Sequence, residues 1–308
     1  MGDNILWLTG SRGFIGRPLL SALKINFPEV RCFTNRPIVE GSENQENSCQ
    51  YMDYSNPNDI KDKFEKLGSP NIFIHLGWGG MTEPGAKVHL EENVKDGKSL
   101  IDTVYERGVS KFLFIGSMNE YGGRTGSLSE YMEPEGRLTN YAKGKIDVAK
   151  YGFQRAKELG KTFIHIRPFY VYGHGQRSGS LINDVYDAYK DGRSPVLGPC
   201  EQYRDYIHVI DVAEGIVLSS KLNNSTTLNL GSGRFIQVKN FVSTFWDCLG
   251  GEKDKLKFGS RPMRLGEPEQ PKSFADLTHL KELTGWTPER SLEDGIKLTI
   301  EKLNSSLS

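Results

Sequence analysis

Short apolar runs alternate with longer amphipathic segments along the first 167 residues of the chain. The apolar runs have the length of buried strands, and they read "NILWLTG", "VRCFT", "CQYMD", "NIFIHLG", "KFLFIGS" and "TFIHIRP". The segments between them repeat apolar residues at helical spacing, as in "FIGRPLLSALKI" and "NPNDIKDKFEKLG". Strands and helices in this alternation predict an α/β protein with a doubly wound parallel sheet, which is a Rossmann fold.

The pattern becomes less regular after about residue 167. Gly, Pro and aromatic residues are more frequent there, although "TTLNLGSG" is expected to return a strand to the main sheet and "SLEDGIKLTIEKLN" to form a final helix. We expect a dinucleotide-binding domain of residues 1–166 with a returning segment near 205–233. A smaller α/β substrate-binding domain, residues 167–204 and 234–308, is expected to close a cleft over it.

Composition excludes several other classes of protein. The 308 residues carry 39 Lys plus Arg against 39 Asp plus Glu, and this balance does not favour a nucleic-acid or membrane partner. No apolar run is long enough to cross a membrane. The scattered cysteines contain no CxxC pair, so we expect reduced thiols in a cytoplasmic protein without a metal site. They are Cys32, Cys49, Cys200 and Cys248.

The stretch "LTGSRGFIG" joins the first predicted strand to the first predicted helix. Gly10 allows the tight turn, Gly13 lets a pyrophosphate approach the backbone, and Gly16 lets the helix pack on the sheet. The free N–H groups and the positive end of the helix would bind the phosphates, with Phe14 and Ile15 beside them. The alternative is a plain glycine-rich turn, but its place at the first strand of a βαβ series favours dinucleotide binding.

The second strand ends in "CFTNRP" and has no carboxylate to bind the ribose hydroxyls of NAD. Asn35 and Arg36 stand there instead, and Arg12 lies in the glycine turn. Two guanidinium groups pair well with a 2′-phosphate, so we favour NADP(H) over NAD(H), unless Arg36 stacks on adenine or points to solvent. Asp53, followed by Tyr54, is placed to bind the adenine amino group, although it could also be an ordinary surface carboxylate.

A second group of residues has the spacing of a catalytic site. Ser117 ends the fifth strand, and "YAKGK" brings Tyr141 and Lys145 onto one face of a helix. Lys145 is expected to lower the pKa of Tyr141 and to hold the nicotinamide ribose. Tyr141 would then exchange a proton with a sugar oxygen that also bonds Ser117. A YxxxK match alone can be a surface Tyr and a solvated Lys, but its order after the glycine turn and the serine argues for catalysis.

With these motifs the chain closely resembles the extended short-chain dehydrogenase/reductase family that acts on nucleotide sugars. Further landmarks span essentially the whole chain: "HLGWGG", "EENV", "RPFYVYG", "RDYIHVIDVA", "NLGSG", "RLGE" and "GWTP". The resemblance implies cofactor contacts from Leu76, Gly77, Asn93 and Pro168. It implies a nucleotide-diphosphate sugar as the substrate and a homodimer formed through a four-helix bundle.

The resemblance also implies residues that contact the substrate. Arg204 and Arg264 match positions that bind the nucleotide diphosphate, whose charge suits forked cationic donors. The alternative for Arg204 is an ion pair with Asp205 or Asp211. The remaining positions implied to contact substrate are Trp78, Ser117, Asn119, Tyr170 and Glu267.

Three reactions are common among proteins of this kind. Dehydratases need an acidic pair where this chain has Met118 and Asn119, and Glu120 is one residue out of register. Epimerases that keep a bound NAD usually carry the missing acid after the second strand and often have Asn in place of Tyr170. We therefore predict an NADPH-dependent reductase of a nucleotide-linked 4-keto-6-deoxy sugar. The alternatives are a nucleotide-sugar 4-epimerase and a non-catalytic NADP-binding sensor. His174 is expected to be a loop residue.

Overall fold

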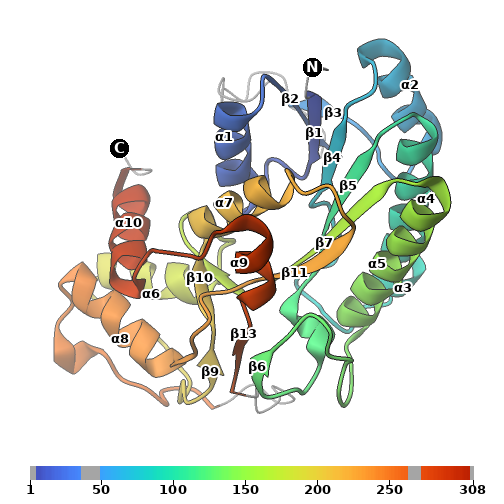
Figure 1. Cartoon of the computed structure of the whole chain (residues 1–308). Coiled ribbons are helices and arrows are strands. Elements are labelled where there is room, and N and C mark those ends of the chain that lie inside the picture. Colours follow the sequence, from blue (N-terminus) through green and yellow to red (C-terminus); the bar gives the residue numbers. More distant parts are fainter. Residues whose placement is uncertain (1–4, 36–48, 263–271, 306–308) are drawn as a thin grey trace.

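The computed structural model describes residues 5–35, 49–262 and 272–305. Its centre is a seven-stranded parallel sheet with the order β11-β7-β5-β4-β1-β2-β3 (Figure 1), which confirms the predicted doubly wound α/β fold. Its strands are β1 (Ile5–Thr9), β2 (Glu29–Thr34), β3 (Gln50–Tyr51), β4 (Ile72–His75), β5 (Lys111–Ile115), β7 (Thr162–Pro168) and β11 (Thr226–Leu230).

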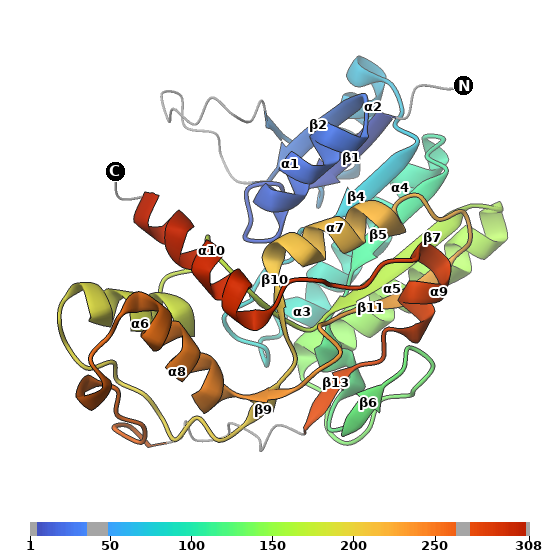
Figure 2. The ribbon, with the colours of Figure 1, turned by 60° about the vertical axis from the view of Figure 1, so that its left-hand side comes forward.

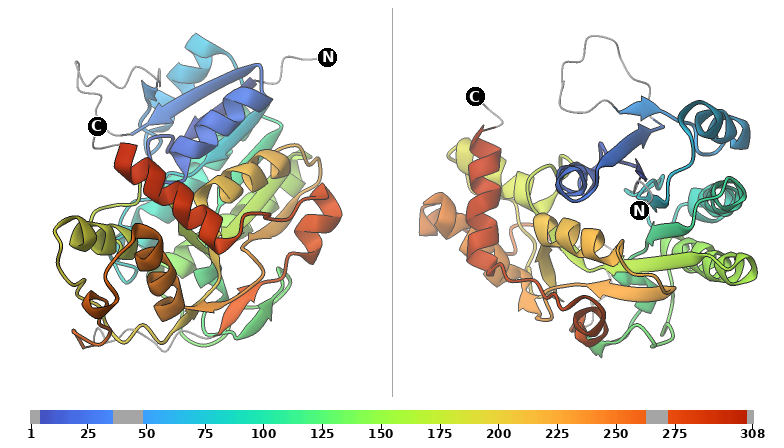
Figure 3. Two further views of the ribbon diagram at one scale, coloured as in Figure 1. Left: turned by 90° about the vertical axis from the view of Figure 1, so that its left-hand side faces the viewer. Right: turned by 45° about the horizontal axis from the view of Figure 1, so that its top comes forward.

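Helices cover both faces of this sheet, as the right-hand view of Figure 3 shows. Along β1, Leu6 and Leu8 pack in one core and Trp7 in the other, because successive side chains of a strand point to opposite faces. The first face carries α1 (Gly16–Asn26) and α7 (Val209–Ser219); the second carries α2 (Pro57–Leu67), α4 (Asn93–Glu106) and α5 (Asn140–Leu159), and the short α3 (Val88–Glu91) precedes α4.

A second group of elements has its own aromatic core, and it lies beside the lower end of α1 and α7 in Figure 2. Phe241, Phe245 and Trp246 are almost completely buried in it. Its elements are α6 (Leu181–Lys190), α8 (Val238–Leu249), η2 (Lys253–Lys255), α10 (Leu292–Ser305), the parallel pair β8 (Tyr170–Tyr172) and β10 (Tyr206–His208), and the antiparallel pair β9 (Tyr203–Arg204) and β12 (Ile236–Gln237).

The remaining elements attach to the edge of the main sheet formed by β11. The strand β6 (Gly126–Leu128) follows η1 (Met118–Tyr121) and pairs in parallel with β13 (Ser273–Ala275). The helix α9 (Thr278–Thr284) buries Leu280 in the core shared with α1 and α7. These C-terminal elements fall within the range assigned to the substrate domain, and the domain boundaries stay a prediction. No helix of the described residues is long and apolar enough to span a membrane.

Candidate functional site

A cleft of about 1570 Å³ follows the carboxyl ends of the sheet strands and continues between the main sheet and the aromatic region. Pockets for one small ligand usually measure roughly 300–1000 Å³, so this cleft can hold a dinucleotide and a second ligand. Every described candidate residue lines it: Gly10, Arg12, Gly13, Phe14, Ile15, Gly16, Asn35, Asp53, Tyr54, Leu76, Gly77, Trp78, Asn93, Ser117, Asn119, Tyr141, Lys145, Pro168, Tyr170 and Arg204. Arg36, Arg264 and Glu267 lie outside the described residues.

The glycine turn has the geometry that a pyrophosphate needs. Gly10 adopts a φ of +74°, and a Cβ on Gly16 would overlap the carbonyl of Gly10. Gly13 N–H donates to Gly10 O at 3.0 Å, which closes the turn. Among the described residues, no side chain caps the first turn of α1, and that turn contains no acidic residue. The first N–H groups of the helix can therefore bind phosphate oxygens.

The predicted adenosine end of the cleft is formed by the ends of β2 and β3. Asn35 and the exposed Arg12 line it beside Asp53. Asp53 Oδ1 accepts hydrogen bonds from the amide and the hydroxyl of Ser55, at 3.0 and 2.6 Å. The adenine contact of Asp53 stays a prediction, as does the preference for NADP(H), because Arg36 is outside the described residues.

The loop after β4 forms the wall nearest the predicted nicotinamide position. A Cβ on Gly77 would come within 2.8 Å of Tyr54 Oη, so only glycine fits there without a shift of Tyr54. Asn93 holds the next part of the loop, because its Oδ1 accepts from Gly79 N–H at 3.2 Å and its Nδ2 donates to Gly79 O at 3.1 Å. Asn93 therefore shapes the loop from a position that also lines the cleft.

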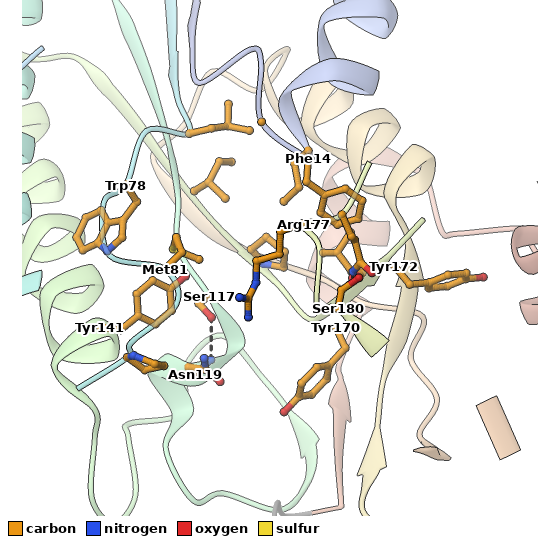
Figure 4. A pocket seen from close by; sticks show the side chains of 18 of the residues that line it. Phe14, Trp78, Met81, Ser117, Asn119, Tyr141, Tyr170, Tyr172, Arg177 and Ser180 are labelled. Atoms are coloured by element: carbon orange, nitrogen blue, oxygen red, sulfur yellow. Dashed lines mark hydrogen bonds between the residues drawn. The ribbon is translucent and has the colours of Figure 1, made fainter. Parts of the chain in front are cut away.

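The helix α5 places the predicted catalytic pair on its buried face. Its first turn is capped by Thr139 Oγ1, which accepts from Ala142 N–H at 3.2 Å, and Tyr141 and Lys145 follow one turn apart. Lys145 Nζ donates to Ile115 O at 2.7 Å. Figure 4 shows Tyr141 and Ser117 on the same side of the cleft, with the bond from Asn119 N–H to Ser117 Oγ drawn at 3.2 Å.

Burial is the largest influence on the electrostatics of this pair. Burial raises the pKa of Tyr141 to about 12, although a hydrogen bond with Ser117 acts in the opposite direction. Burial also lowers the pKa of Lys145 to about 7, and the charge of Glu120 opposes this shift. Removal from water penalises the charged form of both groups, so the net pKa of Tyr141 lies above its usual value. That the charge of Lys145 lowers the pKa of Tyr141 stays a prediction.

Glu120 is completely buried behind the serine and does not face the cleft. Its carboxylate accepts hydrogen bonds from Ser117 N–H at 2.8 Å, from His165 Nε2 at 3.1 Å and from Arg167 Nε at 3.0 Å. Although burial raises the pKa of Glu120, its His165 and Arg167 neighbours outweigh that effect and hold the pKa below its usual value. Glu120 and Ser117 also form a capping box at the start of η1, so the role of Glu120 is structural.

Two predicted substrate residues have partners that the sequence did not reveal. The ring of Trp78 lines the cleft and also covers Lys145 Nζ, which lies 3.9 Å from its centroid, and its contact with the sugar stays a prediction. The guanidinium of Arg204 stacks on Tyr170 at 4.2 Å. The carboxylates proposed as alternative partners of Arg204 have other bonds: Asp205 accepts from Ser232, Gly233 and Ala275, and Asp211 pairs with Arg290.

Arg177 is a functional candidate that the sequence reasoning missed. It lies in the loop between β8 and α6, and Figure 4 shows its side chain extending into the cleft toward Ser117 and Asn119. The available signal was a cation within the glycine-containing stretch "GHGQRSG". His174, in the same loop, does not line the cleft; burial and the charges of Arg17 and Lys302 lower its pKa. Among the described residues, no group of three or more His, Cys, Asp or Glu side chains could hold a metal ion.

The chain is similar to known proteins over most of its length. The model of the NAD dependent epimerase/dehydratase family matches residues 6–231. The chain is 24% identical over 253 residues to the UDP-glucuronate 4-epimerase of Thermodesulfobacterium geofontis, covering 81% of this chain and 77% of the relative.

Two solved structures show the same fold. The UDP-glucose 4-epimerase of Thermotoga maritima, solved with UDP-glucose, has a TM-score of 0.85 at 24% identity and covers 98% of this chain and 99% of its own. The protein RMD of Pseudomonas aeruginosa, complexed with NADPH, has a TM-score of 0.80 at 22% identity and covers 98% and 99%.

Proposed function

Because the chain belongs to the NAD dependent epimerase/dehydratase family, we propose that this enzyme is a nucleotide-sugar 4-epimerase acting on a UDP-linked hexose. One observation carries the proposal: the cleft offers Tyr141 and Ser117 for proton transfer at one sugar oxygen, while Glu120 is buried away from it. The relatives that act on UDP-glucuronate and UDP-glucose favour epimerisation over the reductase predicted from the sequence.

The residues of the cleft divide the reaction between them. The glycine turn would hold the dinucleotide, which when bound accepts a hydride from C4 of the sugar and returns it. Tyr141 would remove the proton of the C4 hydroxyl and later restore it, and Ser117 would hydrogen-bond the same oxygen. Lys145, one turn from Tyr141, would stabilise the phenolate electrostatically while it is ammonium. The sugar would have to turn between the two transfers, so that the hydride returns to the other face of C4.

Dehydration needs a further acid and base near C5 and C6 of the sugar. Met118 is buried, and Asn119 has neither function. The carboxylate oxygens of Glu120 already accept hydrogen bonds from Ser117, His165 and Arg167. The proposal therefore confines the chemistry to the oxidation and reduction of one carbon.

A second candidate is the NADPH-dependent reductase of a nucleotide-linked 4-keto-6-deoxy sugar. The specific observation in its favour is the end of β2, where Thr34 is buried and Asn35 lines the cleft in place of a carboxylate. RMD, a structural neighbour complexed with NADPH, is consistent with such a cofactor. A reductase would use Tyr141 once, as the acid that protonates the new alkoxide.

One assay separates these candidates. The purified protein is denatured and the released dinucleotide identified by mass spectrometry. The native protein is then incubated with UDP-glucose, UDP-glucuronate or UDP-N-acetylglucosamine without added cofactor, and the products are resolved by NMR. Interconversion of C4 epimers supports the proposal. A parallel incubation contains NADPH and a nucleotide-linked 4-keto-6-deoxy sugar. Stoichiometric NADPH consumption there, with no interconversion of the UDP-sugars, replaces the proposal with the reductase.

Dimerisation is a further part of the proposal. The helices α4 and α5 pack side by side on one face of the sheet (Figure 1), joined by a salt bridge of 2.9 Å between Lys98 and Asp147. A dimer through these helices would form a four-helix bundle. Sedimentation equilibrium tests it, and a monomer at micromolar concentration would rule it out.

A further inference from the structure

Lys145 is a buried cation with an unusual environment. Lys145 is about 3% exposed, and among residues 5–35, 49–262 and 272–305 Nζ makes one hydrogen bond, to Ile115 O. Two aromatic faces lie next to Nζ, which is 3.9 Å from the ring centre of Trp78 and 4.7 Å from that of Phe114. Within the part of the chain that the structure describes, no carboxylate is bonded to Nζ. The negative faces of the two rings therefore provide much of the electrostatic stabilisation that a counter-ion would give to a buried ammonium.

The indole of Trp78 is held in this orientation by a neutral histidine. Trp78 Nε1–H donates to His89 Nδ1 at 3.0 Å, so the ring proton of His89 must be on Nε2, which lies 3.0 Å from Glu83 O. His89 is completely buried. The planes of the two rings are nearly parallel, with an interplanar angle of 14° and centroids 6.3 Å apart.

The helix that carries Lys145 leaves room for this arrangement. A Cβ on Gly144 would lie 3.2 Å from Trp78 Cζ2 and 2.5 Å from His89 O, so glycine is required at this close approach. Tyr141 completes the group, because its ring meets those of Trp78 and His89 edge-on at 6.2 and 5.4 Å. Residues from the loop after β4, from α3 and from α5 thus form one packed unit around Nζ.

We propose that Trp78 is a positioning residue that keeps Lys145 charged and in place beside Tyr141, with His89 fixing the plane of the indole. The proposal rests on the role of Lys145 in the proposed function, but not on the identity of the sugar. The other groups that face Lys145 are Glu120, whose charge favours the ammonium, and His75, which is neutral because burial lowers its pKa to about 3.

The first test needs no substrate. Tryptophan emission is recorded from pH 5 to 9, and the Trp78→Phe spectrum is subtracted from that of the parent protein. A charge beside the indole changes its emission, so we expect a transition with a midpoint near pH 7, the pKa of Lys145. The transition should vanish when Lys145→Met is the background for the same subtraction. A flat difference, or a transition that persists without Lys145, overturns the proposal.

The second test uses turnover. Loss of the ring in Trp78→Leu should lower the pKa of Lys145. The alkaline limb of the plot of kcat against pH should therefore move to lower pH by about one unit. At pH 8 this shift lowers kcat about tenfold (~1.4 kcal/mol). KM for the nucleotide sugar should stay within about threefold of the parent value. Trp78→Phe keeps an aromatic face, so its alkaline limb should lie close to that of the parent protein. Trp286 is a partly buried tryptophan of the other core, and Trp286→Phe should not shift the limb.

Two outcomes of the second test would overturn the proposal. An equal loss of kcat at every pH would show a merely structural role, and a tenfold rise of KM with unchanged kcat would show that Trp78 contacts the sugar. Melting temperatures confirm that each variant is folded. If the parent protein turns over no nucleotide sugar, the proposed function fails, while the emission titration still decides the role of Trp78.

Discussion

The two sides of the cleft are built in different ways. The dinucleotide side rests on seven parallel strands, so its turns are positioned by backbone hydrogen bonds such as that from Gly10 N–H to Phe33 O. The substrate side has strands of only two or three residues and depends on ring packing, including Tyr206 stacked on Phe241 with centroids 4.0 Å apart. We therefore expect chemistry that needs fixed geometry on the first side, and a second side that can vary with the shape of a substrate.

The largest expected effect is on the dinucleotide side, at Tyr141. Tyr141→Phe should lower kcat by about 10²–10⁴-fold, because positioned proton transfer contributes about that much. Dinucleotide affinity should change little. Steady-state kinetics and dinucleotide titration measure both. Tyr151→Phe on the same helix, which loses a bond to Asp102, is the matched control and should keep kcat. An equally active Tyr141→Phe protein would remove Tyr141 from the mechanism.

The next largest effect is on stability, and it concerns Glu120, which bonds the backbone N–H of Ser117. Glu120→Gln should destabilise the protein by about 3–5 kcal/mol at pH 7, because Arg167 then stays buried without its counter-charge. The lowered pKa of Glu120 means that its contribution is present above the unfolded pKa near 4.5 and is lost as the pH falls through the folded value.

Urea unfolding measured from pH 7 down to pH 3 checks this prediction. The difference in unfolding free energy between the Glu120→Gln variant and the parent should shrink at the acidic end. Glu158→Gln, in an exposed pair with Arg155, is the control and should behave like the parent. A constant difference at all pH values would show that the charge of Glu120 is not what stabilises this turn.

The third effect lies on the substrate side. Arg204→Ala should raise KM for a nucleotide sugar about ten- to a hundredfold, because hydrogen bonds to charged groups contribute roughly 1.5–3 kcal/mol. kcat and dinucleotide affinity should remain close to the parent values. Isothermal titration with UDP measures the loss directly, with the surface variant Arg193→Ala as the control. A fall in kcat instead would mean that the two sides of the cleft do not divide binding from chemistry in this way.

The smallest effect on stability at neutral pH is expected from two buried histidines, His75 on the dinucleotide side and His208 on the substrate side. Burial lowers the pKa of His75 to about 3 and that of His208 to about 4. Both are neutral in the fold and gain a proton on unfolding, so their contribution is complete above the unfolded pKa of 6.5 and is lost as the pH falls toward the folded values. At pH 5, keeping each histidine neutral in the fold should lower the free energy of unfolding by about 2 kcal/mol relative to its value above pH 6.5.

His75→Asn and His208→Asn should therefore make the stability less dependent on pH between 6.5 and 4. Hydrogen exchange at pH 5 would show which side opens first, and we expect the substrate side with its shorter strands. An unchanged pH dependence in both variants would mean that other groups cause the acid sensitivity.

Much of the fold could be predicted from the sequence alone. The seven strands of the sheet, the return of β11 to its edge and the spacing of Tyr141 and Lys145 on one helix face all depend on periodicity within a single element. The glycine turn could be predicted for the same reason, since the positive φ of Gly10 is a local property and a Cβ on Gly16 would overlap the nearby carbonyl of Gly10. The geometry within one element depends on residues close together in the chain, so it can be predicted from their spacing.

Tertiary structure decided the properties that depend on distant residues. Trp78 covers Lys145, Glu120 joins Arg167, and Arg177 extends toward Ser117, although each pair is separated by dozens of positions in the chain. The high pKa of Tyr141 and the low pKa of Lys145 arise because several elements together exclude water from both groups. Burial is a property of the assembled molecule, so no motif within one segment could have predicted the direction of those shifts.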